Sequence, residues 1–235
     1  MDPRNESQSA AAYRVVIVDD HPLFRAALQS AVSAACTTGE FFEADSVAAM
    51  LDTLEHHPGV DLLLLDLSLP GAHGFSALAY LRGAYPQLPV VIVSALDDPT
   101  TVQQAMAFGA QGFLSKSASA DAICASVGAV LRGDVVTPAG YRGAGAGSPD
   151  NAALEVAERL AQLTPQQFRV FSKLCSGRLN KQIAYEMQIT EATVKAHMTV
   201  IMRKLGAANR TQTALLAARL TLNPDEIKVQ PEEPD

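Results

Sequence analysis

Three carboxylates stand directly after two apolar runs of the sequence. Asp19 and Asp20 follow Val15–Val18, and Asp66 follows Leu62–Leu65. An apolar run that ends in an acid is typical of a buried parallel strand that delivers a charge to the edge of a sheet. Ligands of open α/β sheets bind at the carboxyl edge, where we expect these acids to meet. A single acid of this kind could be a helix cap, but three indicate a cation site, and Mg²⁺ prefers oxygen ligands.

Two further polar residues complete this set. Ser94 follows the apolar run Val90–Val93, and Lys116 follows Gly112–Ser115, so both project to the same edge. Together with the acids they suit phosphoryl transfer, in which catalysis is mostly positioning and neutralisation of charge. We therefore predict that Asp66 is the nucleophile that accepts the phosphoryl group.

The other members of the set would then hold the metal and the phosphoryl oxygens. Asp19 and Asp20 would bind Mg²⁺ together with Asp66 and the backbone carbonyl of Ser68. Lys116 would pair with one phosphoryl oxygen, and the hydroxyl of Ser94 would donate a hydrogen bond to another.

The elements that must position these residues alternate between strand and helix. We expect strands at residues 14–18, 41–44, 62–65, 89–93 and 111–114. Helices are expected at about residues 22–35, 46–56, 74–85, 99–108 and 118–131. Five such units with short connections predict the α/β class, with a five-stranded doubly wound parallel sheet and right-handed crossovers. A second domain, all-α and of the helix-turn-helix type, is expected after it.

Four segments of the first half resemble the receiver domain of two-component response regulators, over roughly residues 14–135. They are Asp19-Asp20-His21-Pro22, Leu65-Asp66-Leu67-Ser68-Leu69-Pro70-Gly71, Val93-Ser94-Ala95 and Gly109-Ala110-Gln111-Gly112-Phe113-Leu114-Ser115-Lys116. The resemblance implies a CheY-like fold and a phosphate that comes from a histidine kinase or a small phosphodonor. It also places Phe113 at the family's aromatic switch position, where the ring moves with Ser94, although an aromatic strand residue is often plain core packing.

Charge divides the chain into an acidic and a basic part. The net charge is −7 overall and −9 over residues 1–138, whereas residues 160–222 carry nine Lys and Arg against two acids. The basic part is a candidate for nucleic-acid binding, although a solvated helical surface would have the same charge. A Gly- and Ala-rich stretch predicts a linker at residues 136–158, between a receiver at 14–135 and a DNA-binding domain at 159–222. Polar tails are expected at 1–13 and 223–235.

The spacing of apolar residues in the basic part predicts a helix-turn-helix. Thr164 and Thr190 are expected helix N-caps, and the helix after Thr190 reaches about Leu205. Its apolar residues fall on one side, and the other side carries small, hydroxyl and cationic residues, which suit a helix in the major groove. An ordinary amphipathic helix would show the same spacing.

Residues 163–211 resemble the LuxR-type helix-turn-helix, and the whole chain resembles the NarL/FixJ subfamily of response regulators. The motifs are Asn180-Lys181-Gln182-Ile183-Ala184, Thr193-Val194-Lys195-Ala196-His197 and Lys204-Leu205-Gly206. The resemblance implies base contacts from Lys195, Ala196 and Thr199. It implies flanking or phosphate contacts from Thr193, His197, Arg203 and Lys204. A fourth helix at about 211–222 would serve dimerisation.

Two residues depart from the LuxR-type pattern. Gln167 stands where glutamate is usual, and we expect it to alter a structural hydrogen bond or ion pair. Thr199 stands where a longer polar or basic residue is common, so the operator of a relative cannot be transferred to this chain.

The sequence as a whole predicts a phosphorylation-controlled transcription regulator that is not an enzyme beyond its own phosphorylation and dephosphorylation. Its partners would be DNA, a kinase or phosphodonor, and a second copy of the chain when phosphorylated. We expect a cytoplasmic protein without membrane contact, because no apolar run approaches the roughly 20 residues that span a bilayer and the three cysteines form no cluster.

Three rival hypotheses remain open at this point. The receiver could act only in dimerisation, without phosphorylation. The first half could be a Mg²⁺-dependent phosphohydrolase, although no general acid stands two residues after Asp66, where Ser68 lies. The chain could also be an adaptor that sequesters a kinase, although the basic segment makes DNA the better partner.

Overall fold

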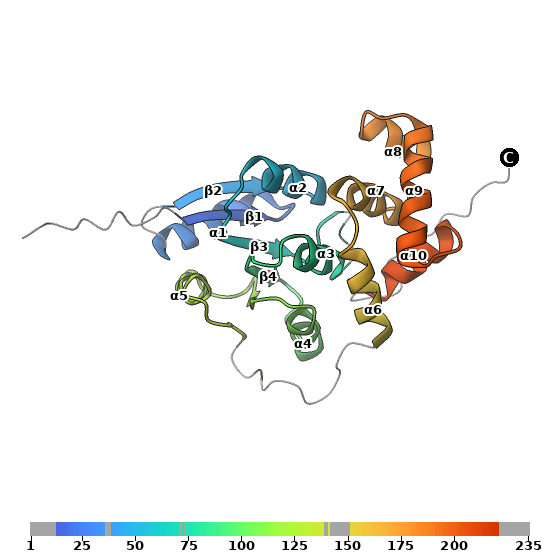
Figure 1. The fold of residues 1–235 in the computed structure, drawn as a ribbon. Coiled ribbons are helices and arrows are strands. Elements are labelled where there is room, and N and C mark those ends of the chain that lie inside the picture. The colour runs from blue at the N-terminus through green and yellow to red at the C-terminus, as the bar shows by residue number, and fades with distance from the viewer. Residues whose placement is uncertain are drawn as a thin grey trace, which may run out of the picture.

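The computed structural model describes residues 13–35, 39–70, 72, 74–138, 141 and 151–220. Over these residues an α/β domain is followed by a group of helices (Figure 1). The expected tails lie outside the described residues, except for Tyr13, which begins the first strand, and so does the stretch Gly143–Pro149. Within the described residues no helix is both long enough and apolar enough to cross a bilayer.

The α/β domain contains five parallel strands in the order β2-β1-β3-β4-β5. The strands are β1 (Tyr13–Val18), β2 (Gly39–Ala44), β3 (Leu62–Asp66), β4 (Val90–Ser94) and β5 (Gly112–Ser115). The helices are α1 (Pro22–Ala35), α2 (Val47–His56), α3 (Ser76–Ala84), α4 (Pro99–Ala107) and α5 (Ala120–Leu131). This arrangement confirms the predicted fold class.

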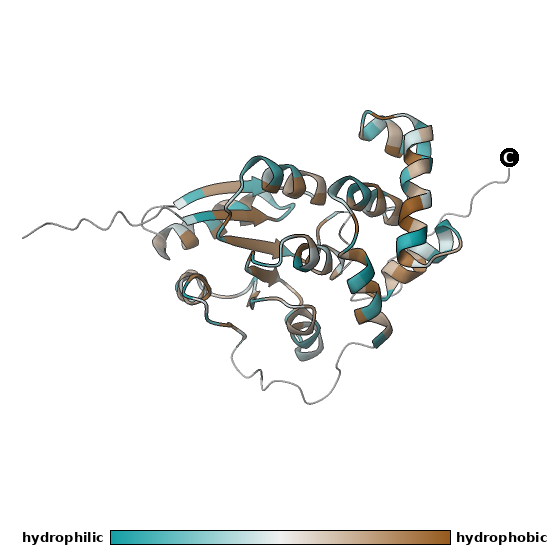
Figure 2. Cartoon of the chain, in the orientation of Figure 1, coloured by the Kyte–Doolittle hydropathy of each residue, from teal (hydrophilic) through white to brown (hydrophobic). Residues whose placement is uncertain are grey.

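Alternate residues of each central strand supply two apolar layers. Val16 and Leu63 pack with α2, α3 and α4, whereas Ile17 and Leu64 pack with α1 and α5. Helices therefore cover both faces, and Figure 2 shows the apolar strands between them. Burial on both faces explains why these strands are continuous apolar runs, without the alternation of a half-exposed sheet.

The second part of the chain is helical throughout its described elements. They are α6 (Asn151–Leu160), α7 (Pro165–Cys175), α8 (Asn180–Glu186), α9 (Glu191–Leu205) and α10 (Arg210–Ala218). Both predicted caps are present: Thr164 accepts a hydrogen bond from the backbone N–H of Gln167, and Thr190 accepts one from Thr193. Gly206 ends α9 in the left-handed region, with φ of 70°.

The predicted linker at 136–158 is shorter in the structure. Its last part lies in α6, whose Val156 and Leu160 are buried. Its first residue, Val136, pairs with Gly112 at the open edge of β5 and accepts a hydrogen bond from the N–H of Phe113 at 2.9 Å. The helix α6 begins just after the Gly- and Ala-rich stretch, and the predicted linker was extended over it although its own residues favour a helix.

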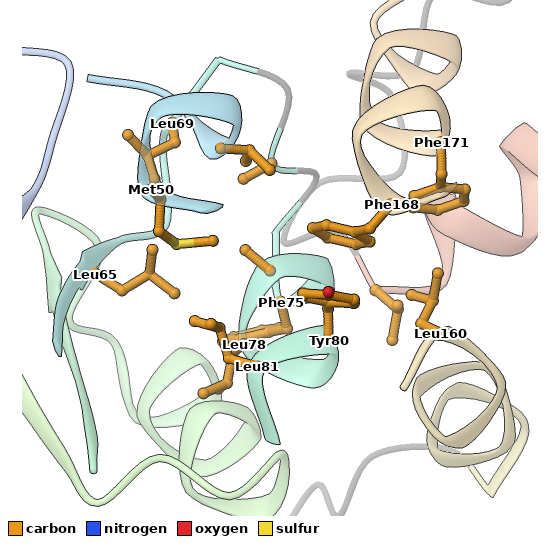
Figure 3. Packing of buried hydrophobic residues seen from close by; sticks show 14 of the residues in the cluster. Met50, Leu65, Leu69, Phe75, Leu78, Tyr80, Leu81, Leu160, Phe168 and Phe171 are labelled. Atoms are coloured by element: carbon orange, nitrogen blue, oxygen red, sulfur yellow. The ribbon is translucent and has the colours of Figure 1, made fainter. Parts of the chain in front are cut away.

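One apolar core extends through both parts of the chain. Its residues run from Met50 and Leu65 in the α/β domain to Leu160 and Phe171 in the helical part (Figure 3). The helical part is therefore packed directly against α2 and α3, a contact that no pattern in the sequence predicts.

We predict opposite effects on stability from two glycine substitutions. Gly206→Ala should lower the free energy of unfolding by about 1–2 kcal/mol, because a Cβ disfavours the left-handed conformation. Gly128→Ala should raise it by about 0.5–1 kcal/mol, because Gly128 lies inside α5 and alanine is the better helix former. Urea denaturation followed by circular dichroism measures both. If both substitutions changed the free energy of unfolding equally and in the same direction, the role of Gly206 in ending α9 would be contradicted.

Candidate phosphorylation and DNA-binding sites

The three acids of the sequence motif meet at the carboxyl edge of the sheet. Asp66 is the last residue of β3, and Asp19 follows β1, whose Val18 lies opposite Leu65. Asp19 and Asp66 are each only 1% exposed, whereas Asp20 is partly exposed. Two buried carboxylates at one edge repel each other and require a counter-ion.

Lys116 supplies that positive charge from the end of β5. Its Nζ lies 2.6 Å from Oδ2 of Asp19 and 2.8 Å from Oδ2 of Asp66. The ring of Phe24 lies under the same ammonium, with the centroid 4.8 Å away. The backbone N–H of Lys116 donates to the carbonyl of Ser94, which ties the ends of β4 and β5 together.

Burial and charge act against each other on the pKa values of this pair. Burial raises the pKa of Asp66, and the hydrogen bonds from Lys116 and Ser68 offset only part of that rise. Burial lowers the pKa of Lys116, but Asp19 and Asp66 outweigh it, so the pKa of Lys116 is raised. The lysine is thus held in its charged form between the two acids.

The donor set at this edge fits a divalent cation. Asp19, Asp20, His21 and Asp66 can each offer a ligand atom, and these atoms lie within 4.8 Å of one another. Oδ2 of Asp19 and Oδ1 of Asp20 are buried and accept no hydrogen bond of normal geometry, although they contact Lys116 and His21. Carboxylate oxygens left in this state are the ligands that Mg²⁺ prefers.

His21 and Arg25 belong to this site, although the sequence patterns did not predict a role for them. Nδ1 of His21 lies 2.7 Å from Asp20 and 3.2 Å from Asp19. Arg25 donates to the backbone carbonyl of Asp19 at 2.6 Å and pairs with Glu43 of β2 at 2.8 Å. The position of His21 next to the acid pair was an available signal, but nothing in the sequence marks Arg25.

Ser94 and Phe113 lie at the places that the strands dictate. Ser94 is fully buried at the end of β4, and its Oγ accepts a hydrogen bond from the N–H of Leu96 at 3.1 Å. Phe113 is 1% exposed and belongs to the apolar core on the α4 side. The ring is thus inside the core in this structure, and its role as a switch stays a prediction. The N–H of Ser68 donates to Asp66, and its carbonyl as a metal ligand also stays a prediction.

The helix α9 carries the predicted two-sided pattern. Val194, Met198, Ile201 and Leu205 are buried against the other helices. Lys195, Ala196, Thr199 and Arg203 are exposed, so the face expected to read DNA is open to solvent. The hydroxyl of Thr199 donates to the carbonyl of Lys195 at 3.1 Å.

The other residues that were predicted to contact DNA are partly buried or form hydrogen bonds within the helical part of the chain. Thr193 and His197 are half-buried, and the hydroxyl of Thr193 lies 2.8 Å from that of Thr190. Nζ of Lys204 donates to the carbonyl of Gln162 and to Oε1 of Gln167, both at 2.8 Å.

Gln167 completes the cap of α7 in spite of its departure from the LuxR-type pattern. Its Oε1 accepts a hydrogen bond from the N–H of Thr164 as well as from Lys204. The amide therefore keeps the acceptor role that glutamate would have, and only the negative charge is lost.

Both halves of the chain match known protein families. The response regulator receiver domain matches residues 15–128, and the LuxR family of bacterial regulatory proteins matches residues 161–217. The glycerol metabolism activator of Pseudomonas putida is 38% identical over 209 residues, which are 87% of this chain and 95% of that protein. The probable transcriptional regulatory protein NarL of Mycobacterium tuberculosis is 33% identical over 214 residues, covering 89% of this chain and 95% of the relative.

Solved structures show the same fold. RcsB from Salmonella enterica serovar Typhimurium, bound to a promoter in the presence of a phosphomimetic, has a TM-score of 0.51 at 19% identity. The alignment covers 89% of this chain and 99% of RcsB.

We predict that Lys116→Met destabilises the metal-free protein by about 3–5 kcal/mol, because it leaves buried carboxylates without their cation. Saturating Mg²⁺ should recover part of this loss by neutralising the same acids. Urea denaturation with EDTA or Mg²⁺ measures both effects, and Lys181→Met, at an exposed lysine of α8, is the control. A loss no larger than that of the control would show that Lys116 does not balance these charges.

Proposed function

This chain belongs to the two-component response regulators that join a receiver domain to a LuxR-type DNA-binding domain, and we propose that phosphorylation of Asp66 controls its action on DNA. Members of this family are transcription regulators, and phosphorylation control is the family norm. The observation that carries the proposal is the contact of Lys116 with both Asp19 and Asp66 at one edge of the sheet.

The phosphoryl step would use Asp66 as the nucleophile. One carboxylate oxygen attacks phosphorus as the bond to the donor's leaving atom breaks, and the leaving group takes that electron pair. Bound Mg²⁺, held by Asp19, Asp20 and Asp66, with the Ser68 carbonyl as a further ligand, would neutralise charge on the phosphoryl oxygens. The donor would be a histidine kinase or a small phosphodonor.

Two side chains would then hold the new phosphoryl group. Lys116 already lies within 2.8 Å of the Asp66 carboxylate and can pair with a phosphoryl oxygen from there. The Oγ of Ser94 is an acceptor in its bond with Leu96, so its own proton stays free to be donated to another oxygen.

DNA binding would use the exposed face of α9. Lys195 can reach a guanine edge, Ala196 and Thr199 are small enough to approach bases, and Arg203 can pair with a phosphate. Thr193 and His197 would contact the flanks, and Lys204 would contribute through the one ammonium N–H that its two internal bonds leave.

Two copies of the chain would bind together when phosphorylated. Leu215 on α10 is 57% exposed, which suits an apolar contact between two DNA-binding domains. Two recognition helices so joined enter successive major grooves about one helical turn apart. We expect this assembly to form in the cytoplasm.

We predict that Asp66→Asn abolishes Mg²⁺-dependent phosphorylation by acetyl phosphate, because the amide is no nucleophile for phosphorus. Intact-protein mass spectrometry measures the added phosphoryl group, and Asp121→Asn, at an exposed acid of α5, is the matched control. Unchanged incorporation in Asp66→Asn would refute the site. DNA binding that never responds to phosphorylation would favour a receiver used only for dimerisation.

We predict different losses from two cations of α9. Lys195→Ala should cost about 1–3 kcal/mol at the preferred site and relax specificity at one base position. Arg203→Ala should weaken binding at all sequences and reduce the salt slope by about one. Fluorescence anisotropy on an operator selected from a randomised pool measures both, with Arg132→Ala in the receiver as the control. Affinities equal to the control in both variants would mean that α9 is not the reading helix.

A further inference from the structure

Arg25 occupies an unfavourable place for a cation. It is the fourth residue of α1, so it lies in the first turn, where the positive end of the helix dipole opposes a positive charge. Its side chain is nevertheless only 13% exposed. A cation held against the dipole and largely away from water needs partners, and those of Arg25 lie beside the acids of the phosphorylation site.

Arg25 holds both ends of the turn that carries two of the predicted metal ligands. Its guanidinium donates to the backbone carbonyl of Asp19 at 2.6 Å, and its backbone N–H donates to the carbonyl of His21 at 3.1 Å. Asp20 lies between these two points. The position of Arg25 therefore determines the course of the backbone on either side of Asp20.

The edge strand β2 anchors this arrangement. Nε of Arg25 lies 2.8 Å from a carboxylate oxygen of Glu43 in β2. The next residue of β2, Ala44, accepts a hydrogen bond from the N–H of Asp19 at 3.0 Å. The end of β2 thus holds the turn in two ways, through the guanidinium of Arg25 and through its own backbone.

Asp20 depends on this support more than the other acids do. Lys116 contacts Asp19 and Asp66 directly. The carboxylate of Asp20 instead contacts the ring of His21 at 2.7 Å, and its Oδ1 is buried without a hydrogen bond of normal geometry. Because the His21 side chain is 67% exposed, it gives little fixed support, and the backbone of the turn sets where the Asp20 carboxylate lies.

The charge of Arg25 and its hold on the turn act in opposite directions on a divalent cation. A guanidinium near the site repels Mg²⁺, so if charge were its sole effect, removal of Arg25 would strengthen Mg²⁺ binding. If its effect is to orient Asp20, removal would weaken binding. Groups that hold metal ligands from behind typically contribute about 10- to 100-fold to metal affinity, so the second effect should outweigh the first.

We propose that Arg25 is a positioning residue of the metal site, which fixes the carboxylate of Asp20 for Mg²⁺ through the turn Asp19–His21. Glu43 is its anchor on β2. Arg25 acts through the turn and is not itself a metal ligand. The inference rests on the proposed function, since it names a residue that controls the metal affinity of the same site.

Two variants of Arg25 and one matched control separate position from charge. Arg25→Met removes the guanidinium and keeps an apolar side chain. Arg25→Lys keeps the charge but lacks the planar group that binds Asp19 and Glu43 together. Arg14→Met is the control, because Arg14 of β1 pairs with Glu40 of β2 at 3.0 Å and so joins the same two strands at their other end.

Metal binding is measured on the whole unphosphorylated chain. Mn²⁺, which takes the same oxygen ligands, is the probe: the electron paramagnetic resonance of free Mn²⁺ gives its dissociation constant, and displacement gives that of Mg²⁺. Arg25→Met and Arg25→Lys should each raise both constants about tenfold or more, and Arg14→Met should change them less than about twofold. Binding by Arg25→Met as tight as that of the wild type, or tighter, would overturn the positioning role. Wild-type affinity in Arg25→Lys would overturn it equally, because charge would then suffice.

A double-mutant cycle separates positioning from a general loss of structure. In a chain that already carries Asp20→Asn, Arg25→Met should change the Mn²⁺ dissociation constant less than about threefold, because the side chain that it orients is no longer a carboxylate. A loss of about tenfold in both backgrounds would show that Arg25 does not act through Asp20.

A second pair of variants serves if Arg25→Met does not fold, as judged by circular dichroism. Glu43→Ala and Glu43→Gln remove the same charge, but only glutamine can still accept a hydrogen bond from Arg25. Glu43→Ala should bind Mn²⁺ about threefold more weakly than Glu43→Gln, or weaker still. Equal affinities would show that the anchor does not matter for the metal.

Phosphorylation by acetyl phosphate gives a further readout, which a merely structural role would not produce. Arg25→Met should raise the Mg²⁺ concentration for half-maximal rate about tenfold and leave the rate at saturating Mg²⁺ within about threefold of the wild type. An unchanged Mg²⁺ dependence would contradict the inference.

The two proposals fail separately. If Asp66 takes up no phosphoryl group while Arg25→Met still weakens Mn²⁺ binding, the proposed function fails and the positioning role stands. If Asp66 is phosphorylated and Arg25→Met leaves metal binding unchanged, the positioning role alone fails.

Discussion

The rest of this structure depends on the repulsion between two buried carboxylates at one edge of the sheet. Asp19 and Asp66 are held together because β1 and β3 are neighbours in a parallel sheet, and their repulsion is tolerated because Lys116 lies between them. The strand order, the turn that follows each strand and the clamp of Arg25 on Asp19 all maintain this arrangement. Any group that enters the site must compete with Lys116 for contact with Asp19 and Asp66, so the arrangement of these side chains responds to the charge of that group.

The sheet and most of the residues at this edge could be predicted from the sequence. Val15–Val18 and Leu62–Leu65 are apolar on both faces, so their strands had to be central, and the acids after them had to share an edge. The two faces of α9 followed equally from the spacing of Val194, Met198 and Ile201. Such inferences succeed because they depend on periodicity and chain direction, which are local properties.

Contacts between distant segments could not be derived in this way. Tyr80 of α3 and Phe168 of α7 stack on each other. Each lies on the apolar side of its own helix, and no local feature of the sequence tells whether such a side faces its own domain or another one. The helix α6 was missed because it directly follows the Gly- and Ala-rich stretch, although its own residues favour a helix. The resemblance implied a phosphate contact from Lys204, and only the fold reveals that Gln162 and Gln167 accept hydrogen bonds from its ammonium group.

Gly83 of α3 approaches Ala161 so closely that an added Cβ would lie 2.1 Å from the Cβ of Ala161. This close approach has a consequence for how such regulators can diversify. Here α3 has a glycine at the point where Ala161, just after α6, lies against it. The helix α7 carries Phe168, which stacks on Tyr80 of α3, and Arg169, which pairs with Asp52 of α2. A recombined protein would inherit only one half of this fit, so the two domains have to evolve as a pair.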